Sequence, residues 1–199
     1  MNAPVTALRI PEHDVHPQFP ARWSPRAFSA ETMTEAEVLR LLEAARWAPS
    51  AMNLQPWRFV YGLRGDAGFA AILSALVPFN AAWAKDAAAL IAVGSKTTRT
   101  AQDGSEVANA THAFDTGAAW ANLALQAHLA GYVAHGMGGF DPARAASALH
   151  LPDGHTIHAI VAVGRQGDAA QLDDTLRARE VPSPRAPLNT IAFRGSFPG

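Results

Sequence analysis

The strongest constraint on the fold is one long helical pattern, which runs from Thr111 to Ala130. Gly131 follows it and supplies a typical C-terminal stop. The segment is lined by small side chains, namely Ala118, Ala119, Ala121, Ala124 and Ala127. Small side chains let neighbouring elements approach closely, so we expect this helix at the centre of the domain. The same row of small side chains would also suit a subunit interface.

Apolar patterns predict the other elements around this helix. Strands are expected at Trp57–Leu63, Ala87–Val93 and His155–Val163, with a brief one at Tyr132–Ala134. Ala87–Val93 is continuously apolar, which indicates a strand covered on both faces. Helices are expected in three segments. The first begins with a capping box of Thr34 and Glu37 and ends just before Pro49, and the second covers Ala67–Val77 and is stopped by Pro78. The third covers Pro142–Leu149, with Asp141 as its cap. The polar segment Gly94–Asn109 has no period and predicts a surface loop, a candidate lid.

The order of these elements predicts an α+β fold, because strands and helices mix without a regular β-α-β repeat. The length of 199 residues suits one domain, although two small ones remain compatible with it. Four prolines in the first 21 residues indicate an extended arm. We therefore divide the chain into an arm over 1–21 and a single domain over 22–199.

Composition excludes several classes of protein. The net charge of −1 gives no basic excess for nucleic acid, and no run reaches the roughly 20 apolar residues of a membrane span. The chain has no cysteine, which removes disulfides and thiolate nucleophiles. The first twenty residues do not resemble a secretory signal, so we expect a cytoplasmic protein. The histidines are scattered, and no metal site is predicted. No Gly-x-Gly-x-x-Gly, Walker or Gly-x-Ser-x-Gly motif is present.

Two polar segments carry the candidate chemistry. The first, Ala48–Trp57, is framed by Pro49 and Pro56. It presents the donors and acceptors of Ser50, Asn53 and Gln55 on a stiffened loop, and Pro56 predicts extended geometry for Gln55. In the second segment, Arg22 and Arg26 bracket Ser24, a set that suits a phosphate.

Together these segments resemble the nitroreductase family of FMN-dependent oxidoreductases. The matching residues are Arg22-Trp23-Ser24-Pro25-Arg26-Ala27-Phe28, the helix Leu41–Arg46 and the ungapped stretch Ala48–Trp57. The resemblance runs from about Arg22 to the C-terminus. It implies a central mixed, mainly antiparallel sheet flanked by helices. It also implies a homodimer with FMN at the interface, in which the chain termini embrace the partner.

The resemblance further implies which residues contact the cofactor. They are Arg22, Trp23, Ser24, Arg26, Pro49, Ser50, Asn53, Gln55, Asn80, Met137, Gly138, Gly139 and Arg185. Arg22, Ser24 and Arg185 occupy phosphate positions, and Arg26 can instead face the pyrimidine edge of the flavin ring. Asn80 follows Phe79 in a Phe-Asn pair that part of the family shares. No catalytic side chain is implied, since the flavin carries the chemistry.

Gly136–Gly139 has two interpretations. It is either a plain flexible turn or a place where the backbone approaches the flavin ring, which glycine permits. Many family members have a glutamate where this chain has Gly138 and Gly139, a difference that leaves ring-edge contacts and substrate choice open.

The predicted activity is an FMN-dependent NAD(P)H oxidoreductase that reduces nitroaromatic compounds, quinones or similar small electron-poor acceptors. The alternatives are a flavin-dependent dehalogenase, a flavin-degrading enzyme and a non-catalytic flavin-binding protein. NADPH and NADH are both open as electron donors.

Overall fold

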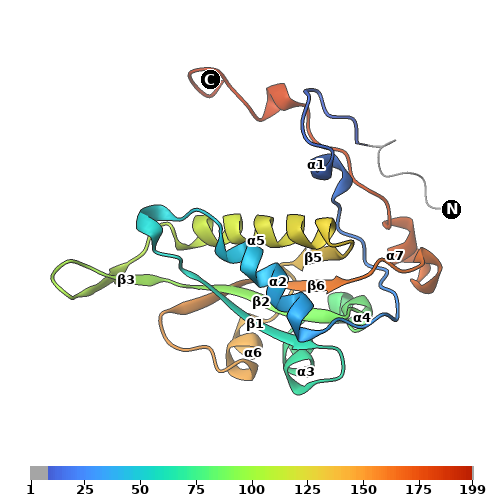
Figure 1. Cartoon of the computed structure of the whole chain (residues 1–199), viewed down its shortest axis with the longest axis horizontal. Helices are drawn as coiled ribbons and strands as arrows, with labels where there is room; N and C mark the ends of the chain where they lie inside the picture. Colours follow the sequence, from blue (N-terminus) through green and yellow to red (C-terminus); the bar gives the residue numbers. More distant parts are fainter. Residues whose placement is uncertain (1–8, 199) are drawn as a thin grey trace.

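A four-stranded antiparallel sheet forms the centre of the computed structural model, which describes residues 9–198 (Figure 1). Part of the predicted N-terminal arm, residues 1–8, lies outside this range. The strand order is β1-β2-β6-β5. The strands are β1 (Trp57–Leu63), β2 (Ala89–Lys96), β5 (Val133–Met137) and β6 (His155–Gly164). Every pairing in this sheet is antiparallel, which fits the predicted α+β class.

Helices cover both faces of the sheet. The helices α2 (Glu35–Arg46) and α5 (His112–Leu129) lie on one face, and α3 (Ala67–Ser74), α4 (Pro78–Ala84) and α6 (Pro142–Ala148) belong to the other (Figure 1). The predicted central helix is confirmed as α5, which is the longest helix and begins after Thr111.

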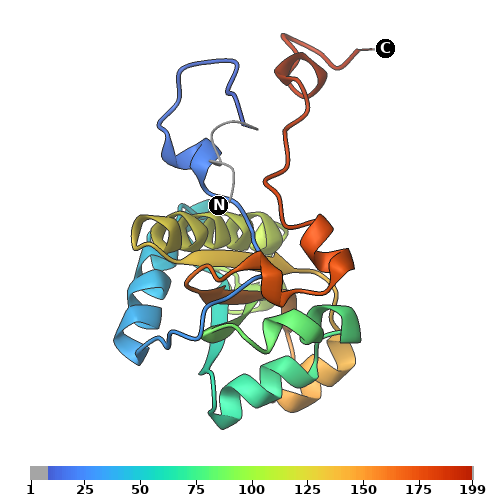
Figure 2. The same cartoon turned by 90° about the vertical axis from the view of Figure 1, so that its right-hand side faces the viewer.

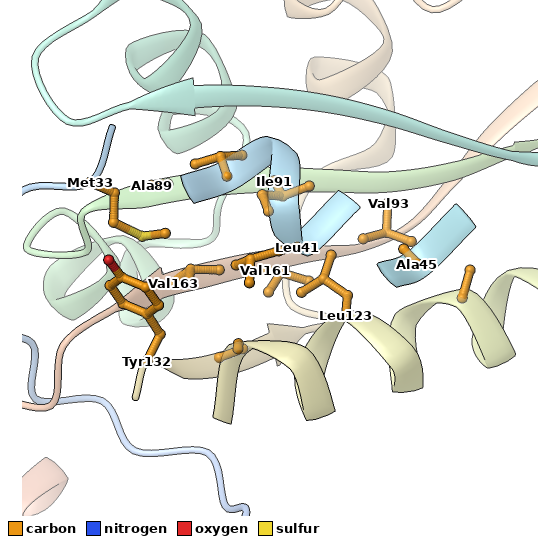
Figure 3. Close-up of a cluster of buried hydrophobic side chains, with 14 of the residues drawn as sticks. Met33, Leu41, Ala45, Ala89, Ile91, Val93, Leu123, Tyr132, Val161 and Val163 are labelled. Carbon is orange, nitrogen blue, oxygen red and sulfur yellow. The ribbon is translucent and has the colours of Figure 1, made fainter. Parts of the chain in front are cut away.

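The two central strands are buried on both faces because their side chains alternate between two apolar layers. Ile91 of β2 and Val161 of β6 point toward Leu41 of α2 and Leu123 of α5 (Figure 3). Their neighbours, among them Leu90, enter the opposite layer with α3 and α4. The prediction of a strand covered on both faces is therefore confirmed for β2.

Several helix starts follow directly from the sequence. Both halves of the capping box form at α2, since the Glu37 N–H donates to the Thr34 hydroxyl and the Thr34 N–H donates to the Glu37 carboxylate. The Asp141 side chain caps α6, with Pro142 in the first helical position. These local signals act without help from tertiary structure.

Several boundaries differ from prediction. The helix predicted over Ala67–Val77 ends at Ser74, and Pro78 begins α4 rather than only stopping a helix. The segment Gly94–Asn109 is not a loop throughout, because it ends β2 and then forms the hairpin β3 (Thr98–Thr100) and β4 (Glu106–Ala108). The strand predicted over Tyr132–Ala134 extends to Met137, so Gly136 belongs to β5 instead of a turn.

Both terminal segments rise from the same end of the molecule (Figures 1 and 2). The N-terminal one contains α1 (Gln18–Ala21), and the C-terminal one contains η3 (Ala169–Gln171), α7 (Asp174–Ala178) and η4 (Leu188–Thr190). Arg9 joins them, since its guanidinium donates to the carbonyls of Pro20 at 3.0 Å and Ser183 at 2.9 Å. Within residues 9–198, no helix is long and apolar enough to cross a membrane.

Candidate functional site

A basic pocket of about 440 Å³ lies where the two terminal segments meet the body of the protein. Five arginines line it, namely Arg9, Arg22, Arg26, Arg179 and Arg185. The remaining lining residues are Trp23, Ser24, His135, Val181 and Ser183. The structure thus brings together Arg22, Trp23, Ser24, Arg26 and Arg185, five of the residues that the sequence predicts as cofactor contacts.

Three of the arginines form a cluster, which we call the three-arginine cluster: Arg9, Arg22 and Arg185. Burial, followed by the charges of Arg185 and Arg22, lowers the pKa of Arg9. Burial, followed by Arg185, likewise lowers the pKa of Arg22. The Arg22 guanidinium also donates to the Ser24 hydroxyl at 3.3 Å. Like charges held this close are favourable only when an anion compensates them.

Arg26 and Arg179 form a separate pair in the same pocket. Burial, followed by the charge of Arg179, lowers the pKa of Arg26, and Glu180 partly offsets this effect. The Glu180 carboxylate lies 3.9 Å from the Arg26 guanidinium. In the part of the chain that the structure describes, the other four pocket arginines have no carboxylate within 4.0 Å. The pocket therefore carries uncompensated positive charge and suits a phosphate.

His135 forms part of the pocket wall and was not singled out by its sequence context. Its Nδ1 lies 3.0 Å from the Pro25 carbonyl, and its ring packs against Trp83 at a tilt of 44°, with 4.7 Å between the ring centres. Burial lowers the pKa of His135 to about 4. The imidazole is therefore neutral at pH 7, and its Nδ1–H donates to Pro25.

The helix α4 connects this pocket to the glycine segment. Trp83 lies under the Arg26 guanidinium at 6.0 Å, and one turn earlier Asn80 donates to the Gly139 carbonyl at 2.9 Å. A Cβ at Gly139 would lie 2.6 Å from the Asn80 amide nitrogen, whereas Gly138 is exposed and has open space around it. Met137 is buried in β5. The predicted contacts Asn80, Gly138 and Gly139 therefore lie together beside Arg26, and only Gly139 needs to be glycine for packing.

The loop between α2 and β1 has an unusual backbone. Met52, Asn53 and Gln55 have φ values of 51°, 54° and 47°. The extended geometry predicted for Gln55 is therefore wrong: its N–H donates instead to the Ser50 hydroxyl at 3.1 Å, which closes the loop. Left-handed conformations in residues other than glycine are strained and gather at functional sites.

This loop lies far from the basic pocket of the same chain. The Ala51 N–H donates to Asp115 at 3.3 Å, near the start of α5, while Arg22 contributes to lowering the pKa of His128 near its end. These two α5 residues are about 20 Å apart along the helix axis. The predicted contacts Pro49, Ser50, Asn53 and Gln55 are therefore not brought to the pocket within one chain.

Five pocket residues were not predicted from the sequence: Arg9, His135, Arg179, Val181 and Ser183. Arg179 and Ser183 lie near Arg185 in the polar tail, which was a usable signal, whereas nothing in the sequence connects Arg9 or His135 to the site. Among residues 9–198, no group of three histidine or acidic side chains could hold a metal ion.

The chain is similar to known proteins over most of its length. The sequence profile of the nitroreductase family matches residues 20–67 and 62–165. An uncharacterized 15.4 kDa protein of Mycolicibacterium smegmatis is 36% identical over 150 residues, which are 70% of this chain and 97% of that protein. A crystal structure of an oxidoreductase containing FMN is 46% identical and covers 96% of each chain, with a TM-score of 0.93. A Desulfovibrio desulfuricans structure, described as a nitroreductase in complex with FMN, is 24% identical over 93% of this chain and 100% of that one, with a TM-score of 0.71.

Proposed function

Because the chain belongs to the nitroreductase family, we propose that it is an FMN-dependent oxidoreductase that uses NADPH or NADH to reduce an electron-poor acceptor, such as a nitroaromatic compound or a quinone. Bound FMN would supply the hydride chemistry, and the protein supplies binding, orientation and electrostatics. The observation that carries the proposal is the three-arginine cluster with Ser24, because its charges lack carboxylate partners within residues 9–198.

The three-arginine cluster and Ser24 bind the phosphate in this proposal. Arg22 and Arg185 present planar donors that pair well with phosphate oxygens, and the Ser24 hydroxyl adds a neutral donor. Arg9 holds the tail in place through Ser183, so that the N-terminal and C-terminal arginines reach the same anion.

Arg26, Asn80 and the backbone of Gly139 hold the ring end. Arg26 lies beside Trp83, one helical turn from Asn80. Positive charge at the pyrimidine edge of a flavin favours its anionic reduced form, so Arg26 promotes reduction. Gly139 keeps the backbone open, and its contact with Asn80 fixes the orientation of the amide.

The distance between the pocket and the Ser50–Gln55 loop supports a homodimer. Both segments match flavin-contacting motifs, yet about 20 Å of α5 separates them in one chain. A twofold dimer with antiparallel α5 helices brings the loop of each subunit to the pocket of the other. Each flavin then contacts both subunits.

The outer surface of α5 supports the same arrangement. Phe114, Gly117 and Ala121 are exposed at helical spacing, and 84% of the Phe114 surface is accessible. A large exposed aromatic side chain beside small residues is typical of a helix that packs against a partner. The exposed termini then extend over the second subunit.

Cofactor extraction and mass measurement on the purified protein test the proposal first. We expect the extract to contain FMN. In stopped flow, NADPH or NADH should bleach the bound flavin, and a nitroaromatic compound or a quinone should reoxidise it. Absence of flavin, even after incubation with excess FMN, would contradict the proposal. Flavin that neither nicotinamide bleaches would instead indicate a binding protein without this activity. Reoxidation by halogenated compounds alone would indicate a dehalogenase.

A further inference from the structure

One arginine of the pocket, Arg179, has no role in the proposed flavin site. Arg179 follows the end of α7, and its guanidinium carbon lies 5.7 Å from the centre of the Phe79 ring. Phe79 is in the first turn of α4, and 46% of its surface is accessible. A guanidinium over an aromatic face is held by cation–π attraction, so the two side chains form one unit.

The charge of Arg179 is not compensated by its neighbours. Glu180 lies beside Arg26, and no carboxylate within the described residues is within 4.0 Å of Arg179. The three-arginine cluster already provides three cations for a phosphate with at most two negative charges. Arg179 therefore has its positive charge available for a second anionic group.

The Arg179–Phe79 pair lies beside the ring end of the proposed flavin site. Phe79 precedes Asn80, which donates to the Gly139 carbonyl. Arg26 donates to the Arg179 carbonyl at 3.4 Å, so both chain segments are joined there. A substrate stacked on the flavin ring would have the exposed phenyl group and the free guanidinium within the same rim of the pocket.

We propose that Arg179 and Phe79 form a substrate subsite that selects acceptors carrying a carboxylate on an aromatic ring. This inference rests on the proposed function, because the acceptor is defined by its stacking on the flavin. The guanidinium binds the carboxylate through paired N–H donors, and Phe79 packs against the substrate ring. The acceptor class is thereby narrowed from electron-poor aromatics to anionic ones.

The test uses ligands of equal shape and different charge. Benzoate and benzamide are titrated into the flavin-loaded dimer by calorimetry, and 4-nitrobenzoate and 4-nitrobenzamide are compared in turnover. We expect Arg179→Gln to weaken benzoate binding and lower kcat/KM for 4-nitrobenzoate by about tenfold, with the amides changed less than about twofold. Phe79→Leu should weaken both members of each pair equally. The control is Arg177→Gln, which removes an exposed arginine already paired with Asp174.

Equal losses for benzoate and benzamide in Arg179→Gln would overturn the subsite. A loss of activity seen with NADPH but not with NADH would also overturn the subsite, because the Arg179 charge would then bind the electron donor rather than the acceptor. Flavin content and bleaching by nicotinamide are measured on the same samples. If benzoate selectivity depends on Arg179 while no nicotinamide bleaches the flavin, the subsite stands and the proposed electron donor is wrong.

Discussion

The Glu180 carboxylate accepts a hydrogen bond of 2.6 Å from the backbone N–H of Arg26, 154 positions earlier in the chain. The same oxygen accepts from the N–H of Ala27 at 2.8 Å. Only 2% of the Glu180 side chain is accessible. One buried carboxylate thus joins the C-terminal tail to the segment that contributes Arg22, Ser24 and Arg26 to the basic pocket.

We predict that Glu180→Ala destabilises the flavin-free protein by about 2–4 kcal/mol, because two backbone donors lose their buried acceptor. Glu180→Gln keeps an acceptor oxygen and should cost less than about 1.5 kcal/mol. Urea denaturation measures both. Equal losses in the two variants would mean that the charge, rather than the acceptor geometry, holds the tail.

Removing either phosphate arginine should weaken FMN binding. We predict that Arg22→Ala and Arg185→Ala each raise the Kd for FMN by about 10- to 100-fold, the value of a charge-assisted hydrogen bond. Fluorescence titration of the flavin-free protein gives the constants. Arg40→Ala is the control, since Arg40 is exposed on α2. Unchanged affinity in both variants would place the phosphate elsewhere.

A site shared between subunits predicts complementation. Dimers of Arg22→Ala alone, or of Asn53→Ala alone, carry a defect in every site. A heterodimer of the two variants has one site with neither substitution and one site with both. Random mixing makes about half of the dimers heterodimers, so about a quarter of all sites should be restored. Flavin content after mixing and subunit exchange measures this. No recovery in verified heterodimers would mean that the pocket and the loop serve one flavin within a single chain, or separate ligands.

Burial of His135 predicts a specific pH dependence. Its folded pKa is about 4, below the ordinary value of 6.5, so the unfolded chain takes up the proton first. The contribution to stability is complete above pH 6.5 and is lost as the pH falls toward 4, by up to about 3 kcal/mol. Denaturation of flavin-free wild type and His135→Gln between pH 7 and 4.5 measures it. The difference in stability between wild type and His135→Gln should change as the pH falls from 6.5 toward 4. A difference that stays constant with pH would show that His135 titrates normally.

The two adjacent glycines should respond differently to alanine. A Cβ at Gly139 meets Asn80 at 2.6 Å and Val77 at 3.2 Å, so Gly139→Ala must displace the Asn80 amide. We expect a cost of about 1–3 kcal/mol, together with weaker flavin binding. Gly138→Ala enters open space and should change stability by less than about 0.5 kcal/mol. Thermal unfolding of both variants measures the two stability changes. Equal destabilisation by Gly138→Ala and Gly139→Ala would contradict the prediction.

Much of the fold could be predicted because local signals and burial agree. The pattern Thr111–Ala130 became α5, and the pair Thr34 and Glu37 formed the capping box of α2. The hairpin of β3 and β4 was missed because its strands have three residues each and little apolar content. It is held by polar contacts such as the 2.7 Å hydrogen bonds that the Thr98 and Thr100 hydroxyls donate to the Glu106 carboxylate, and such contacts leave no apolar periodicity in the sequence.

The site was predictable only where a motif marks it. Arg22, Ser24 and Arg185 were predicted because they occur in recognisable segments, and the fold places all three in the basic pocket. Arg9 and His135 join them through tertiary contacts that no local sequence pattern encodes. The conformation of Gln55 was also beyond local rules, because the closed loop overrides the preference of a residue that precedes proline.

The basic pocket takes all its arginines from two short stretches, residues 9–26 and 179–185. During synthesis on the ribosome, the sheet and its two apolar layers are therefore complete in sequence before the second half of the pocket exists. If the pocket holds FMN as proposed, it cannot do so until residues 179–185 have been made, so FMN would not template the early steps of folding. Under the proposed function, cofactor loading would follow synthesis of the tail. A chain cut before Arg179 would retain the elements of its core and lose the pocket arginines Arg179 and Arg185.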